Sequence, residues 1–304
     1  MNQRRIGPAR RVALAVAGAA TARGLLAVLR SAPPGGRQTW ERTNHRGEPV
    51  SLLAGSALTG AAALTAAAGA PCVPLCGAAL VAGVGAGAVG VYDDLVGSRP
   101  EQHADKGFRG HLLALRAGRV STGLVKVVGI GAAGLLAARA VTGRPVDTVV
   151  TAGVVAGTAN LVNLLDLRPG RALKAGLLLG VPLVSGPAGG LVAGPVGASV
   201  ALLGEDLGER VMLGDTGANA LGAVLGLRVA LAGGPRWRLG ALGVLVALTA
   251  ASEKVSFTRV IESTPVLRQV DALGRRPRVP PAPPEPRSDE VTGGATDGSV
   301  NGTA

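Results

Sequence analysis

The chain has 304 residues, of which 31 are Lys or Arg and 19 are Asp or Glu, so its formal net charge is +12. Hydrophobic residues make up 47% of it and aromatic residues 2%, which disfavours a basic soluble domain and also nucleic acid as a partner, because few side chains could stack on bases. The combination favours a polytopic membrane protein whose cations gather in cytoplasmic loops.

The N-terminal segment is basic from Met1 to Arg11 and apolar from Val12 to Leu29, apart from Arg23. A secretory signal peptide has a similar start, but its cleavage would place later basic loops outside the cell, so a membrane span is preferred. Further apolar segments approach the roughly 20 residues that cross a bilayer. We predict nine spans, at about residues 12–29, 51–70, 73–92, 123–142, 146–165, 171–187, 188–204, 217–234 and 237–252.

The expected fold is therefore all-α, a bundle of nine to ten transmembrane helices over residues 1–252. If the spans alternate in direction, the cation-rich loops lie on one side, and the opposite loops offer little beyond Arg144, Arg236 and Arg238. The positive-inside rule makes the cation-rich side cytoplasmic, although the basic N-terminus then lies outside. We expect a multi-pass protein of the cell membrane with its polar loops in the cytoplasm.

The C-terminal part differs in character from the spans. Residues 253–276 mix Val, Ile and Leu with Lys and Arg, with Pro265 as a kink, which predicts an amphipathic segment on the cytoplasmic membrane surface. Residues 277–304 are rich in Pro, Gly, Ser, Asp and Thr, and such a composition cannot bury enough apolar surface to fold. We interpret them as a disordered tail.

Four polar clusters interrupt the apolar pattern, and alternation of the spans places all four on the predicted cytoplasmic side. They contain Asn44 and His45; Asp93 and Asp94 with the basic loop from Lys106 to Lys126; Asn160, Asn163, Asp166 and Arg168; and Asp215. Carboxylates at a membrane boundary need a cation, a metal or a proton as partner, since an unpaired buried charge is costly. These clusters are therefore candidate functional positions.

The third cluster repeats every three residues, so Asn160, Asn163 and, less closely, Asp166 share one face of a helix. Polar side chains on one face of a membrane helix point into a bundle or a cavity. An interhelical hydrogen-bond cluster is an alternative that explains the same spacing.

The acids and bases together suggest phosphoryl chemistry. Asp93, Asp94, Asp166 and Asp215 would bring four carboxylates to one cavity. Mg²⁺ takes oxygen ligands from one or two carboxylates and from substrate phosphates, and the nearby Lys and Arg could neutralise a diphosphate. A charged donor from the cytosol and an acceptor from the lipid are the substrates that this arrangement favours.

The order of these motifs over residues 40–252 resembles the polyprenyl-phosphate phosphosugar transferases, which include phospho-N-acetylmuramoyl-pentapeptide transferase and the undecaprenyl-phosphate N-acetylglucosamine-1-phosphate transferases. The motifs that carry the resemblance are Asn44-His45-x-x-x-Pro49, Asp93-Asp94, Lys106 with the loop to Lys126, Asn160-x-x-Asn163-x-x-Asp166 and Gly214-Asp215-x-Gly217. The resemblance implies an Mg²⁺-dependent membrane enzyme of cell-envelope glycan biosynthesis, which moves a sugar 1-phosphate from a UDP-sugar to a polyprenyl phosphate and releases UMP.

The resemblance also implies roles for single residues. Asp215 would be the metal ligand, Asp93 would deprotonate the lipid phosphate or contact the metal, and Asp94 would assist it. Asp166, which we count with Asp93 and Asp94 as catalytic, would contact nucleotide or metal together with Asn163. The substrate-binding residues would be His45, Lys106, Lys126, Asn160, Asn163 and Arg168. A homodimer is one option for the oligomeric state.

Two departures from the family pattern keep other functions open. The family has a His-rich loop near its C-terminus, whereas the histidines here are His45, His103 and His111, and the family's Asp-Gly-Leu-Asp-Gly is here Asp-Leu-Arg-Pro-Gly from Asp166. A catalytically inactive homologue that acts as a partner or regulator of envelope assembly is the main alternative. A transporter is less favoured, because its acids should lie near the middle of the membrane rather than at span ends.

Overall fold

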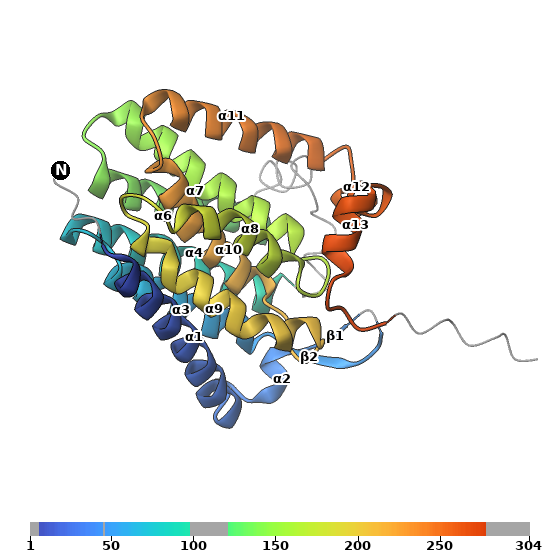
Figure 1. The fold of residues 1–304 in the computed structure, drawn as a ribbon. Coiled ribbons are helices and arrows are strands. Elements are labelled where there is room, and N and C mark those ends of the chain that lie inside the picture. The colour runs from blue at the N-terminus through green and yellow to red at the C-terminus, as the bar shows by residue number, and fades with distance from the viewer. Residues whose placement is uncertain (1–5, 45, 98–120, 278–304) are drawn as a thin grey trace, which may run out of the picture.

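A computed structural model describes residues 6–44, 46–97 and 121–277 of the chain (Figure 1). His45, Lys106 and the predicted tail from residue 278 onward lie outside these described residues. The helices are α1 (Pro8–Ser31), α2 (Arg37–Trp40), α3 (Leu53–Ala68), α4 (Val73–Val96), α6 (Thr122–Val141), α7 (Pro145–Leu165), α8 (Arg171–Leu183), α9 (Gly190–Leu207), α10 (Gly214–Ala230), α11 (Pro235–Ser252), α12 (Phe257–Ser263) and α13 (Pro265–Ala272).

The all-α fold predicted from the sequence is confirmed, and each of the nine predicted spans coincides with one helix in the described part of the chain. Five helices, α1, α4, α6, α7 and α9, are long and apolar enough to cross a membrane. A sixth span is formed if α11 and α12, which are bent by 93° relative to each other, count as one. These helices indicate a multi-pass membrane protein.

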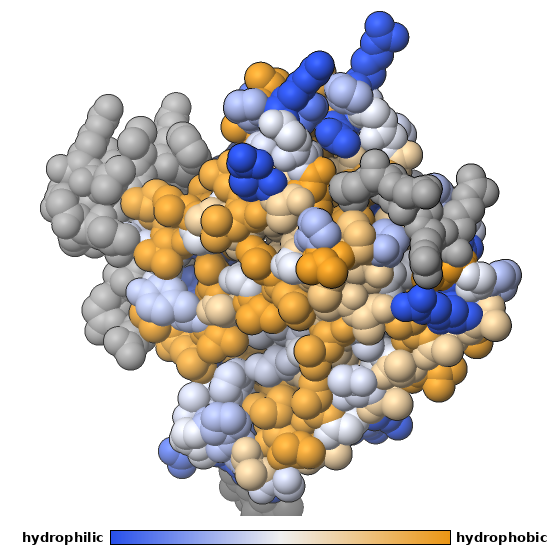
Figure 2. Space-filling view, turned by 90° about the vertical axis from the view of Figure 1, so that its left-hand side faces the viewer, coloured by the Kyte–Doolittle hydropathy of each residue, from blue (hydrophilic) through white to orange (hydrophobic). Residues whose placement is uncertain are grey.

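The predicted count of nine to ten spans is not confirmed, because several helices are short. α3 has 16 residues, α8 has 13 and α10 has 17, against the roughly 20 that a bilayer requires. α10 also contains two charged residues, Asp215 and Arg228, which lower its mean hydropathy. Figure 2 views the molecule from the left of Figure 1, and hydrophobic residues cover most of the surface that it shows.

The centre of the bundle is α10, which packs against α3, α4, α7 and α8. Every residue of this helix is buried except Asp215 and Val229. By contrast, α11 buries only Leu245 and lies along the outside of α7 (Figure 1). The bundle is therefore built around an enclosed helix that carries a carboxylate at its first turn.

Small residues allow the helix backbones to approach closely. α1 packs on α9, and a Cβ atom on Gly18 would lie 2.0 Å from the carbonyl oxygen of Gly194. No side chain could occupy that space. Close packing of this kind holds membrane helices together where lipid removes the hydrophobic drive between them.

A short antiparallel hairpin lies at the end of the bundle where α4 ends and α10 begins. Its strands are β1 (Glu41–Thr43) and β2 (Pro49–Ser51), with Arg42 opposite Val50. Ser51 also pairs with the segment before α10, because its carbonyl accepts a hydrogen bond from the Met212 N–H at 2.9 Å. We call this end of the bundle the polar end. The sequence patterns did not predict the hairpin.

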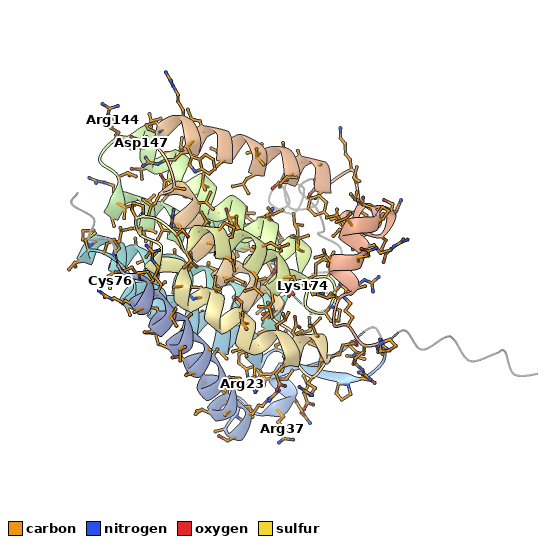
Figure 3. The ribbon with its side chains drawn as sticks, viewed as in Figure 1. Arg23, Arg37, Cys76, Arg144, Asp147 and Lys174 are labelled. Atoms are coloured by element: carbon orange, nitrogen blue, oxygen red, sulfur yellow. The ribbon has the colours of Figure 1, made fainter. Side chains whose placement is uncertain are left out.

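The C-terminal segment folds as α12 and α13, and it docks on the polar end (Figure 1). The predicted kink at Pro265 coincides with the boundary between these two helices, where the proline occupies the first turn of α13. Arg171 at the start of α8 donates hydrogen bonds to both carboxylate oxygens of Asp271, at 2.8 and 3.0 Å. In Figure 3, Lys174 points toward this segment, and Arg144 and Asp147 lie at the opposite end of the bundle.

Candidate active site at the polar end

Asp93 and Asp215 converge on the ammonium group of Lys126. The Lys126 Nζ lies 2.5 Å from Asp215 Oδ2 and 3.3 Å from Asp93 Oδ2. These residues come from the last turn of α4, the first turns of α6 and the first turn of α10. All three side chains are between 16% and 24% exposed, so the charges are shielded from water and still accessible to a ligand.

Asp94 contacts the start of α10, whereas the adjacent Asp93 contacts Lys126. Its Oδ1 accepts the Asp215 N–H at 2.9 Å, and its Oδ2 accepts the N–H and hydroxyl of Thr216 at 2.9 and 2.6 Å. These are N–H groups that the first turn of a helix cannot satisfy internally, so Asp94 caps α10 from another helix. Arg42 of the hairpin donates in turn to the Asp94 carbonyl at 2.6 Å.

The approach of α4 to α10 depends on a glycine one turn before the two aspartates. A Cβ atom on Gly90 would lie 2.4 Å from the Asp215 carbonyl oxygen. On the other side, the Thr59 hydroxyl donates to the Thr216 carbonyl at 3.2 Å. The backbone around Asp215 is therefore held by α3 and α4, which fixes where its carboxylate can lie.

Asp166 follows the end of α7 and lines a separate cavity of about 200 Å³. Burial raises the pKa of this carboxyl well above its usual range, and the charges of Asp206, Asp215 and Asp94 raise it further. The carboxylates of Asp94 and Asp215 therefore act on Asp166 through their charges. The cavity is lined by Thr43, Asn44, Val50, Asp166, Leu167, Arg168, Pro169, Asp206, Glu209, Val211 and Met212, and none of Asp93, Asp94 and Asp215 belongs to it.

Arg168 also lines this cavity, and its guanidinium forms no hydrogen bond or ion pair with any residue that the structure describes. The acids of the cavity have donors: Asp206 accepts the Gly170 N–H at 2.8 Å, and Glu209 accepts the Asn44 amide at 2.8 Å. Arg168 is therefore a cation available to an anionic ligand of the cavity.

Asn160 does not join these groups. Its amide donates to the Thr249 hydroxyl on α11 at 3.1 Å, which is the interhelical hydrogen bond that its spacing allowed as an alternative. Asn163 is half-buried one turn later on α7. His45 and Lys106, which we predicted to bind substrate, lie outside the described residues.

The structure adds functional candidates that the sequence analysis missed. Asp206 and Glu209 line the cavity, and Arg46 forms an ion pair with Glu209 at 3.0 Å. Asp271 is buried against Arg171 and Arg275. An acid at the end of an apolar helix was a usable signal for Asp206, but nothing in the sequence pairs Arg171 with a residue 100 positions later.

The carboxylate oxygens of Asp93 and Asp215 meet some of the requirements of an Mg²⁺ site. Among the described residues, no group of three or more His, Cys, Asp or Glu side chains is arranged to hold a metal. Asp93 and Asp215 nevertheless present carboxylate oxygens to one point, now occupied by the Lys126 ammonium. Mg²⁺ ordinarily takes one or two carboxylate ligands together with substrate phosphates, so Asp93 and Asp215 are the described residues that could hold this ion.

The sequence matches no protein-family model, and no curated protein matches it either. The resemblance described above therefore depends on the sequence motifs alone.

Proposed function

We propose that this protein transfers a sugar 1-phosphate from a UDP-sugar to a polyprenyl phosphate and releases UMP. The observation that carries the proposal is the convergence of Asp93 and Asp215 on Lys126 at the end of two apolar helices, α4 and α6. A lipid whose phosphate lies at the membrane boundary could bring that phosphate directly to this cluster.

In the transfer, an oxygen of the acceptor phosphate attacks the β-phosphorus of the donor. A new P–O bond forms there, the bond from this phosphorus to the oxygen that bridges the two donor phosphates breaks, and UMP leaves with that oxygen. Asp93 would take the proton of a protonated acceptor phosphate, and Lys126 would hold a phosphate oxygen. Asp94 would position the reaction indirectly, because it fixes the first turn of α10 and thereby Asp215.

Asp215 together with Asp93 would hold Mg²⁺, as the convergence of their oxygens on one cation allows. The ion would supply positive charge against the charge that develops on the transferred phosphoryl group. Lys126 would then exchange its present partners for substrate phosphate. The two carboxylates would still face a cation, because Mg²⁺ would take the place of the Lys126 ammonium.

The cavity beside Asp166 is the proposed place for the nucleotide part of the donor. The available Arg168 guanidinium and the polar groups of Asn44 and Asp166 suit part of a phosphorylated nucleoside, since the cavity of about 200 Å³ is smaller than the pockets that usually enclose a whole ligand. The cavity lies close to the cluster of Lys126, Asp93 and Asp215, since Met212 lines the cavity and precedes Asp215 by three residues. A diphosphate could therefore extend from one to the other.

We also propose that the polar end faces the cytoplasm and that the remaining helices bring the number of spans to nine or ten. The positive-inside rule supports this orientation, because Arg42, Arg46, Arg168, Arg171 and Arg275 all belong to the polar end. A UDP-sugar made in the cytosol would then reach the site directly.

A second candidate function has its own support. The segment that replaces the family's His-rich loop is held down by ion pairs, Asp271 with Arg171 and Glu48 with Arg276. Lys126 also forms ion pairs with both carboxylates, so the protein supplies them with a cation of its own. Both features suit an inactive homologue that serves as a membrane partner or regulator in envelope assembly.

A turnover assay separates the two. Full-length protein, purified into nanodiscs, is incubated with polyprenyl phosphate, Mg²⁺ and a panel of UDP-sugars, and UMP is measured. We expect Asp93→Asn and Asp215→Asn to lower UMP release by at least about 100-fold. The matched control is Asp147→Asn, since Asp147 pairs with Arg238 at the opposite end of the bundle. If the wild type releases no UMP, or if all variants release as much as the wild type, the proposed transferase activity is rejected.

A further inference from the structure

Another cavity at the polar end, which we call the arginine pocket, has a volume of about 230 Å³ and lies between the end of α1 and the start of α3. It is lined by Arg30, Pro33, Arg37, Glu41, Ser51 and Leu53. The hairpin separates it from the cavity beside Asp166, because Glu41 and Ser51 line the arginine pocket while Thr43 and Val50 line the other. The arginine pocket is therefore distinct from the proposed active site.

The pocket contains a cation without a partner. Arg37 begins α2, and its guanidinium forms no hydrogen bond or ion pair with any residue that the structure describes. The short helix is held against the loop that follows α1, because the Trp40 indole N–H donates to the Pro34 carbonyl at 2.6 Å and the Thr39 hydroxyl donates to the Gly35 carbonyl at 2.8 Å. The guanidinium is therefore kept at the pocket and is available to an anion.

Cations outnumber acids around this pocket. Arg30 donates to the Glu205 carboxylate at 2.9 Å. The same carboxylate accepts a hydrogen bond from Arg210 at 3.0 Å and lies 3.6 Å from the guanidinium of Arg23. One acid thus faces three guanidinium groups, and Glu41 adds one carboxylate while the unpaired guanidinium of the pocket adds a fourth cation. This surplus of positive charge favours an anionic ligand.

The pocket lies where an apolar helix reaches the expected membrane boundary. α1 is long and apolar enough to cross a bilayer, and Arg30 belongs to its last turn. Val16, Arg23 and Arg30 are spaced by seven residues and share one face of α1, which is open to the surroundings because Val16 and Val28 are each 63% exposed. In Figure 3, Arg23 and Arg37 lie at the same end of the bundle. A lipid with its chains along this face would bring its phosphate to the arginines.

We propose that the arginine pocket binds a phosphate group through the guanidinium groups of Arg37 and Arg30. The planar guanidinium presents paired N–H donors that match phosphate oxygens. The Ser51 hydroxyl is a further donor, because it accepts the Leu53 N–H at 3.3 Å and keeps its own proton for a ligand. The position at the end of α1 favours the headgroup of an anionic phospholipid over free phosphate. This inference does not depend on the proposed transfer reaction.

The test titrates phosphatidylglycerol into the full-length protein in detergent and counts bound lipid by native mass spectrometry. Arg37→Gln removes the unpaired guanidinium and leaves no described residue without a partner. Arg30→Gln removes the other guanidinium of the pocket and leaves Glu205 with two further arginines. The matched control is Arg259→Gln, which removes an exposed positive charge from α12 at the same end of the bundle.

We expect Arg37→Gln and Arg30→Gln each to raise the Kd of the first bound phosphatidylglycerol about tenfold, and Arg259→Gln to change it by less than about twofold. Unchanged binding in Arg37→Gln overturns the proposal. Equal losses in Arg37→Gln and Arg259→Gln also overturn it, because diffuse attraction between charges would then explain the binding.

A second arm distinguishes the two sources of phosphate. Inorganic phosphate is added to the full-length protein without phosphatidylglycerol, and the thermal midpoint is recorded. A rise in the midpoint that Arg37→Gln abolishes identifies free phosphate as the ligand. Binding of phosphatidylglycerol that depends on Arg37 and persists in an excess of inorganic phosphate identifies the lipid headgroup. If neither ligand shows a dependence on Arg37, the pocket is not a phosphate site.

Discussion

The buried ion pair between Arg171 and Asp271 offers the sharpest test of how the C-terminal segment is held. The two side chains are 5% and 9% exposed, and Arg171 contacts both oxygens of the carboxylate. Arg275 adds a bond to the same carboxylate at 2.6 Å. The change Asp271→Ala would leave two guanidinium groups without their acid, one of them buried.

Removal of one partner from a buried pair costs about 3–5 kcal/mol. The segment lies at the polar end of the bundle, so we take the lower bound, about 3 kcal/mol, which corresponds to roughly a hundredfold rise in the equilibrium constant for release of α12 and α13. The bundle itself should stay folded, because the segment is peripheral to it and the core lies around α10. The effect is therefore local.

Hydrogen–deuterium exchange of residues 253–276 measures this release, because amide exchange follows the opening of a local unit. We expect faster exchange in Asp271→Ala and unchanged exchange in Glu253→Ala, which removes an exposed acid from the same segment. The double variant Arg171→Met, Asp271→Leu should regain part of the protection, since it removes the buried guanidinium together with its acid and leaves only Arg275, which is 19% exposed, without its partner. Wild-type protection in Asp271→Ala would refute the role of the pair.

Three other predictions concern pH, capping and packing. Burial raises the pKa of Asp271, but the hydrogen bond and charge of Arg171 outweigh burial and hold the pKa below its usual value. Docking of α13 should therefore be intact at neutral pH and be lost as the pH falls through that lowered pKa. Hydrogen–deuterium exchange measured over a pH series would reveal this loss. Asp94→Ala should lower the free energy of unfolding by about 1–2 kcal/mol through loss of the cap on α10, and an unchanged thermal midpoint would contradict the capping role. Gly18→Leu should destabilise the protein by at least about 1–3 kcal/mol by separating α1 from α9, whereas Gly24→Leu, where a Cβ atom meets nothing within 4 Å, should leave the melting curve unchanged.

Hydrophobic patterning predicted the helices well, because each long apolar segment must form its backbone hydrogen bonds internally whether or not it crosses lipid. It could not show which helices are enclosed by other helices and which face the surroundings. The segment 217–234 was predicted as a span because it is apolar, but α10 begins at Gly214 and ends at Ala230, within a shell of other helices. Apolar composition is equally suited to protein and to lipid surroundings.

The site was predictable only in part. The alternation of helices implied that Asp93, Asp94, Asp166 and Asp215 would share one cavity. Hydrogen bonds link Asp93, Asp94 and Asp215 at one end of the bundle, whereas Asp166 lines a separate cavity. The division of tasks between adjacent aspartates was not predictable, because Asp94 faces the N–H groups of α10 while Asp93 faces Lys126. Neighbouring residues on a helix point in different directions, and only the positions of the surrounding helices decide what each one meets.

The enclosure of α10 sets the order in which heat should damage this protein. Other helices surround α10 along its whole length, so it cannot fray before they separate. By contrast, α11 is covered on one side only, and α12 and α13 are held by a few ion pairs. Moderate warming should therefore release α12 and α13 from the bundle well before it displaces Asp215. A heated sample could lose the docking of α12 and α13 and still keep Asp93, Asp94 and Asp215 in their native arrangement.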